Sequence, residues 1–130
     1  MIALDYPELA GLVQPLAGEW AIRRTLFEQL SVPTGYAVEL AALIDTLALH
    51  GPDAIAQVDL GRRAHGHQAL LDLGAMATQI LAAVRSRGRG GDRGGASDEV
   101  HLRQYRSADG HIVPTERQVP VGERPPARSV

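Results

Sequence analysis

Two stretches of the chain carry apolar residues at α-helical spacing, and they constrain the fold more than any other feature. In the first stretch the helical stripe consists of Tyr36, Leu40, Leu43, Ile44 and Leu47. In the second it consists of Leu70, Leu73, Ala77, Ile80, Leu81 and Val84. We predict that the first helix stops at Gly51-Pro52 and the second near Ser86 or Arg87. Aromatic residues make up 4% of the chain, so the core must consist of Leu, Ile, Val and Ala, which suits helices better than a sandwich.

Three shorter segments have weaker patterns. Residues 22–30 have helical spacing, whereas 11–15 and 54–60 are short apolar runs bounded by Gly and Pro, as in short strands. The strand at 54–60 is followed by a polar, glycine-punctuated loop at 61–68, where open α/β sheets bind ligands. The pattern predicts an α/β fold that is mostly helical, with a few short strands.

The composition divides the chain into an ordered body at 1–87, a Gly/Arg-rich flexible linker at 88–98 and a last segment at 99–130. RNA binding is the alternative interpretation of the linker, but no aromatic residues are interleaved with its arginines. In the last segment Asp109-Gly110 favours a hairpin turn, and the prolines after it are typical of an extended or disordered tail.

Charge and residue usage argue against several classes of protein and of metal site. Thirteen Lys and Arg against fifteen Asp and Glu give a net charge of −2, which argues against nucleic-acid binding. Cysteine is absent, so any metal site must use His, Asp, Glu or water. There is no signal-like N-terminus and no apolar run near the ~18 residues of a membrane helix. We therefore expect a cytoplasmic protein that does not bind a membrane.

Two local features are candidates for chemistry. Glu39 interrupts the apolar stripe in the first turn of its helix, either as a residue that stabilises the helix terminus or as a carboxylate facing a ligand. His65 and His67 flank a glycine and lie either in a solvated loop or near a common metal. The adjacent pair Arg62-Arg63 suits a phosphate, although such pairs are usually solvated.

Four blocks together carry a family resemblance. In order, they are Gln14-Pro-Leu-Ala-Gly-Glu-Trp20, Gly35-Tyr-Ala-Val-Glu39, Ala54-Ile-Ala-Gln-Val-Asp-Leu-Gly61 and His65 through Met76. Their combination resembles the C-terminal part of an actinobacterial glucosyl-3-phosphoglycerate synthase, strongly over residues 9–81 and loosely in the tail. The resemblance implies a retaining GT-A type glycosyltransferase that transfers glucose from UDP-glucose to 3-phosphoglycerate with Mg²⁺ or Mn²⁺.

The resemblance also implies roles for individual residues. The donor-binding positions are Leu16, Gly18, Tyr36, Ala37, Val38 and Glu39. Glu39 is expected to bind glucose hydroxyls as the catalytic-site carboxylate, and His65 is expected to complete the cation site. His67 stands where the family has an acceptor-binding asparagine, which puts the identity of the acceptor in doubt.

The chain departs further from the family, because it contains neither the nucleotide-binding βα units nor an Asp-x-Asp motif. We expect it to be inactive without a complementing N-terminal half. The alternative is a non-catalytic module for dimerisation or ligand binding. The expected partners are the nucleotide-sugar donor, 3-phosphoglycerate, and either a second copy or that complementing half.

Overall fold

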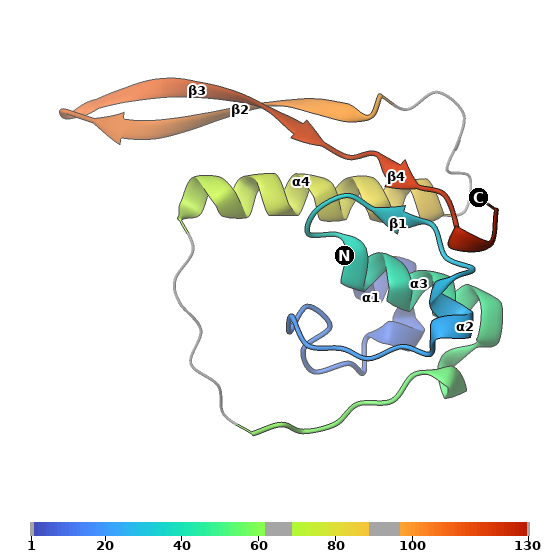
Figure 1. Ribbon diagram of the computed structural model, residues 1–130. Helices are drawn as coiled ribbons and strands as arrows, with labels where there is room; N and C mark the ends of the chain where they lie inside the picture. The colour runs from blue at the N-terminus through green and yellow to red at the C-terminus, as the bar shows by residue number, and fades with distance from the viewer. Residues whose placement is uncertain (1, 62–68, 89–96, 130) are drawn as a thin grey trace.

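The fold centres on two packed helices in a computed structural model that describes residues 2–61, 69–88 and 97–129. The helices and strands are, in order, α1 (Ile2–Asp5), η1 (Pro7–Leu9), α2 (Arg24–Phe27), β1 (Val32–Pro33), α3 (Val38–His50), η2 (Pro52–Ala54), α4 (Leu70–Arg87), β2 (Glu99–Ala108), β3 (His111–Pro120), β4 (Glu123–Arg124) and η3 (Ala127–Ser129). The hydrophobic core joins the N-terminal segment to both long helices through Leu9, Leu40, Ile44 and Val84. This core lies between α3 and α4, beneath the hairpin in Figure 1.

Helix α3 matches the first predicted helix. Leu40 and Ile44 are buried, and Leu43 and Leu47 pack against them. The helix ends where the Gly51 N–H donates to the Leu47 carbonyl at 2.9 Å, with Gly51 at a φ of 77° that favours glycine. Tyr36 lies just before the helix and is 54% exposed, so its assignment to the buried stripe was wrong.

Helix α4 has the predicted bounds, but only Val84 of its predicted apolar stripe is fully buried, with Ile80 packed against the core. Its buried residues are Ala75, Gln79, Ala83 and Val84. Leu73 and Leu81, which belong to the predicted apolar stripe, are 45% and 46% exposed. Small residues face inward because the hairpin and the loop before α3 approach this side of the helix closely.

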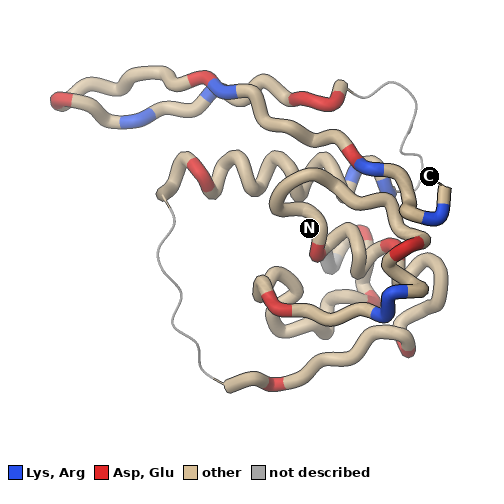
Figure 2. The backbone as a smooth tube through the Cα atoms, viewed as in Figure 1, with Lys and Arg blue, Asp and Glu red and all other residues tan. Residues whose placement is uncertain are grey.

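The hairpin of β2 and β3 runs along α4, and its tip extends beyond the N-terminal end of that helix (Figure 1). Ala108 pairs with His111 around Asp109 and Gly110, whose φ values of 49° and 77° suit the predicted turn. Acidic and basic residues both occur along its strands (Figure 2). The Gln104 side chain donates to the Leu71 carbonyl at 3.1 Å, which holds the hairpin on α4.

The segment after the hairpin is ordered against the body of the protein. Strand β4 pairs antiparallel with β1, with Val32 opposite Arg124. The Thr34 N–H and hydroxyl both donate to the Gly122 carbonyl, at 2.9 and 3.0 Å. The predicted tail therefore wraps a surface, and it completes a two-stranded sheet beside the start of α3.

Three predicted elements were wrong in type or length. Residues 11–15 and 54–60 form no strand in the described part of the chain, because no neighbouring backbone forms a ladder with them. Instead, the Gln57 side chain bonds the Gly11 carbonyl at 3.1 Å and the Val13 N–H at 2.7 Å. The helix expected at 22–30 is limited to Arg24–Phe27, since Arg23 has an extended backbone.

None of the helices described at 2–61, 69–88 and 97–129 is long and apolar enough to cross a membrane.

Candidate functional site

A groove of about 770 Å³ lies between the loop at 14–20, the start of α3 and one face of α4. The residues that line it are Gln14, Pro15, Leu16, Ala17, Gly18, Trp20, Gly35, Tyr36, Val38, Glu39, Met76 and Ile80. Five residues with predicted donor-binding roles are among them, namely Leu16, Gly18, Tyr36, Val38 and Glu39. Two segments about twenty positions apart thus meet at one concave surface, which neither segment forms alone.

The loop side of the groove is shaped by a turn and an aromatic pair. Gly18 has a φ of 77°, and no atom lies within 4 Å of where its Cβ would be. Trp20 packs against Phe27 of α2 with ring centroids 6.0 Å apart and an interplanar angle of 54°. Both rings keep exposed area, 45% for Trp20 and 36% for Phe27. The contact between the two rings therefore fixes the loop to α2, and the exposed part of Trp20 lines the groove.

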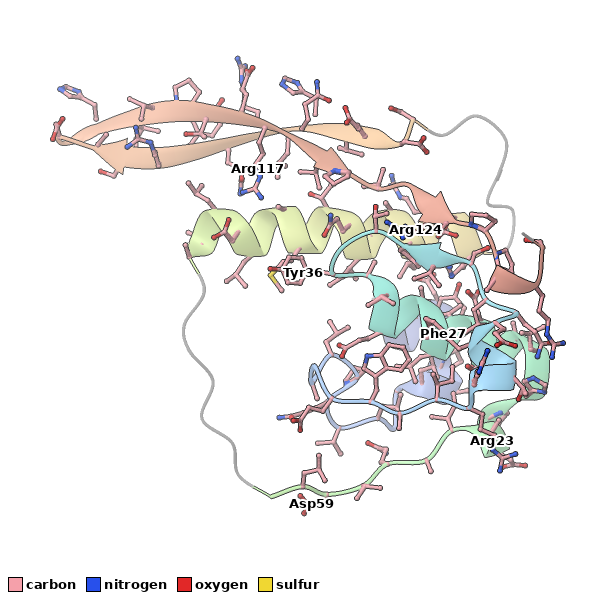
Figure 3. The ribbon with its side chains drawn as sticks, in the orientation of Figure 1. Arg23, Phe27, Tyr36, Asp59, Arg117 and Arg124 are labelled. Carbon is pink, nitrogen blue, oxygen red and sulfur yellow. The ribbon has the colours of Figure 1, made fainter. Side chains whose placement is uncertain are left out.

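The helix side of the groove begins at Gly35, whose φ of 92° turns the chain into α3. Figure 3 shows Tyr36 beneath α4, at the entrance to α3. Ala37 is buried, with 2% of its surface exposed, and does not line the groove. This placement leaves its backbone, rather than its methyl group, as the part suited to contact a ligand.

Glu39 lies half-buried in the first turn of α3 and lines the groove. The N-cap residue of this helix is Ala37, and no side-chain hydrogen bond caps the terminus. Among the described lining residues Glu39 alone carries a formal charge. A carboxylate beside apolar side chains can accept hydrogen bonds from the hydroxyl groups of a ligand.

Known proteins with related sequences share one activity. The chain is 48% identical over 87 residues to a glucosyl-3-phosphoglycerate synthase of Mycobacterium tuberculosis, an alignment that covers 67% of this chain and 27% of the relative. It is 39% identical over 134 residues to the synthase of Mycolicibacterium paratuberculosis, covering 100% of this chain and 39% of the relative. No family model matches the sequence.

Solved structures agree with the sequence comparison. The Mycobacterium tuberculosis synthase in complex with Mg²⁺ and UDP superimposes with a TM-score of 0.84 at 41% identity, over 98% of this chain and 43% of that one. Its complex with Mn²⁺, UDP-glucose and phosphoglyceric acid gives a TM-score of 0.79 at 40% identity, over 98% and 42%. The chain is homologous to part of the glucosyl-3-phosphoglycerate synthases. It spans about two fifths or less of the length of these relatives, and its fold is part of their α/β glycosyltransferase fold.

The described residues do not form a metal site by themselves. No three His, Asp or Glu side chains gather within residues 2–61, 69–88 and 97–129. His65 and His67, and the pair Arg62-Arg63, lie outside the described residues. Glu39 is the one acidic side chain among the described residues that line the groove.

Prediction from sequence did not assign roles to several lining residues, nor to Gln79, which does not line the groove. Trp20 and Met76 belong to the blocks that resemble the synthase family, but the resemblance gave them no role. Gln79 was missed altogether, although it is 8% exposed and contacts the loop that forms the groove wall. The available signal was a polar residue spaced four positions from both Ala75 and Ala83 on one helical face.

Proposed function

We propose that this chain forms the glucose-binding side of a glucosyl-3-phosphoglycerate synthase. In the proposed reaction, glucose passes from UDP-glucose to the hydroxyl of 3-phosphoglycerate in the presence of Mg²⁺ or Mn²⁺. The observation that carries the proposal is the meeting of Leu16 and Gly18 with Tyr36, Val38 and Glu39 in one groove. Relatives with this activity are 38% identical or more over most of this chain, which supports the same assignment.

The proposed roles combine what the family resemblance implies with the chemistry of each residue. The Glu39 carboxylate accepts hydrogen bonds from glucose hydroxyls, while the side chains of Leu16, Tyr36 and Val38 pack against the ring. By the family resemblance, His65 would supply one ligand to a divalent cation, which would stabilise the diphosphate leaving group, and His67 would contact the acceptor. The donor and acceptor are ionised phosphate compounds for which a bilayer is a barrier, so we place the reaction in the cytoplasm.

Catalysis is proposed to require the rest of the family fold. The groove presents a carboxylate and no Lys or Arg among its described lining residues, so it suits the sugar and not the diphosphate. Four apolar side chains are each more than 60% exposed, namely Val13, Val58, Leu60 and Leu70. Their exposure supports coverage of these side chains by a further segment or partner. We therefore expect product only when this chain is combined with the portion of a relative that it lacks.

Binding of UDP-glucose should depend on Glu39. Trp20 is the one tryptophan in the sequence and lines the groove, so its fluorescence reports ligand binding. We expect UDP-glucose to change the Trp20 emission, and Glu39→Gln to weaken that binding about tenfold or more, because a charge-assisted hydrogen bond is lost. Glu99→Gln is the matched control, since Glu99 is exposed at the start of the hairpin and does not line the groove.

The same titration has outcomes that contradict the proposal. Equal affinity for UDP and UDP-glucose would show that the groove does not recognise glucose. An unchanged affinity in Glu39→Gln would remove Glu39 from the donor site. Product formed from UDP-glucose and 3-phosphoglycerate by this chain alone would refute the requirement for the rest of the fold.

The second candidate function, association of two copies, is favoured by the hairpin. Its strands are ten residues long, and Tyr105 and Ile112 near its tip are 61% and 72% exposed. Neither outer strand edge pairs with another strand within the described residues, and such edges can add a second chain. We expect a dimer in sedimentation velocity, converted to a monomer by Ile112→Lys. A monomeric unmodified chain at high concentration would contradict this role.

A further inference from the structure

Gln79 is a buried polar residue at the centre of α4. It is 8% exposed, and the residues one turn before and after it on the same face, Ala75 and Ala83, are each 5% exposed. A buried amide is costly unless its oxygen and nitrogen both find partners. The partners of Gln79 therefore indicate what this residue holds in place.

The two ends of the Gln79 amide bond different parts of the chain. Its oxygen accepts the Tyr36 N–H at 3.1 Å, and its nitrogen donates to the Pro120 carbonyl at 2.9 Å. Tyr36 precedes the first residue of α3, and Pro120 is the last residue of β3. A side-chain amide suits this place because it donates and accepts at once, which neither a carboxylate nor an ammonium group does.

The wall of the groove also packs directly on this amide. A Cβ at Gly35 would lie 2.5 Å from the Gln79 nitrogen and 2.6 Å from its oxygen, so the absence of a side chain at Gly35 permits the contact. The bonded peptide leads within a few residues to Val38 and Glu39, which line the groove. Any movement of the Gln79 amide therefore moves the start of the wall.

The opposite end of the amide is fixed to the hairpin. Val119, next to Pro120, is 2% exposed. The Gly122 carbonyl accepts hydrogen bonds from the N–H and the hydroxyl of Thr34. The loop at 34–36 is thus bonded to the segment after β3 on one side and to Gln79 on the other. Gln79 of α4 therefore joins the loop that forms the groove wall to the end of the hairpin.

We propose that Gln79 is a positioning residue for the donor site, which holds the glucose-binding wall at Tyr36, Val38 and Glu39 in place from α4 and the end of β3. This role rests on the proposed function, because it assigns the wall to donor binding. Gln79 does not line the groove and acts through the Tyr36 peptide.

The test compares two glutamines that both join α4 to other elements. Gln79→Met removes both bonds to the loop and the hairpin, while Gln104→Met removes the bond from the hairpin to the Leu71 carbonyl and leaves the groove loop intact. Nuclear magnetic resonance follows hydrogen exchange and the chemical shift of the Tyr36 amide, and Trp20 fluorescence gives the affinity for UDP-glucose. We expect exchange about tenfold faster and binding about tenfold weaker in Gln79→Met, and neither change in Gln104→Met.

Several outcomes overturn the proposal. Equal loss of affinity in both variants would show that Gln79 contributes to stability only. A Tyr36 amide that exchanges at the rate of a free peptide in the unmodified chain would show that Gln79 does not hold this amide. That result does not depend on whether Gln79→Met folds. If the unmodified chain protects this amide but binds no UDP-glucose, the proposed function fails, and with it the donor-site part of this role, while the connection itself stands.

Discussion

Replacing Arg87 with methionine should lower the free energy of unfolding by about 3 kcal/mol, because it removes the buried cation that bonds both Asp45 and Glu123. The Arg87 side chain is 4% exposed and donates to both oxygens of Asp45, at 3.0 and 3.1 Å. It also bonds Glu123 and reaches the Ser31 carbonyl at 3.3 Å. One guanidinium therefore joins α4 to α3, to β4 and to the residue before β1.

The electrostatic surroundings explain why this network stabilises the fold. Burial alone lowers the pKa of Arg87, but hydrogen bonds to Glu123 and Asp45 and the charges of both carboxylates raise the pKa above its ordinary value. The charged form is thus favoured in the folded state, and no accessible pH removes the cation. Loss of this network should loosen β4 from β1 and with it the loop that leads to the groove.

Arg117→Met is the matched control for Arg87→Met. Arg117 points from the hairpin toward α4 (Figure 3) and bonds Asp72 at 3.1 Å, but the two side chains are 41% and 56% exposed. Exposed pairs contribute at most about 1 kcal/mol, so denaturant unfolding should separate the two variants clearly. Similar losses in both would show that the Arg87 network is no stronger than a surface pair.

Gly35→Ala should lower the free energy of unfolding by about 3 kcal/mol, through backbone strain and through the loss of the Gln79 hydrogen bonds. The φ of 92° at Gly35 disfavours a side chain, and the new Cβ would collide with the Gln79 amide at 2.5 Å. The amide must then move away from the Tyr36 N–H and the Pro120 carbonyl. Thermal or denaturant unfolding gives the stability, and UDP-glucose affinity should fall with it.

Gly110→Ala is the control for Gly35→Ala, because it introduces backbone strain without a steric collision. Gly110 has a φ of 77°, but nothing lies within 4 Å of where its Cβ would be. We expect this variant to lose about 1 kcal/mol, from backbone strain alone. If Gly35→Ala costs no more than Gly110→Ala, the packing of Gly35 against Gln79 contributes little to stability.

Local signals were enough for the elements whose residues are close in sequence. The apolar stripe and Gly51-Pro52 predicted α3, the periodicity after Leu70 predicted α4, and Asp109-Gly110 predicted the hairpin turn. The predicted strand at 54–60 was wrong because a strand depends on a neighbour, and Gln57 bonds the backbone there through its side chain. The exposure of Leu73 and Leu81 also escaped prediction, since periodicity indicates an apolar face but not what covers it.

By itself the sequence determined the family, the two long helices and five of the residues that line the groove, because motifs and helix signals are local patterns. The tertiary structure alone decided that Leu16 and Gly18 face Tyr36 and Glu39 across one groove. It also decided that Gln79 bonds Tyr36, 43 positions away, and that Arg87 bonds Asp45, 42 positions away. Such pairs carry no local pattern, because their geometry exists only after α3, α4 and the hairpin have packed together.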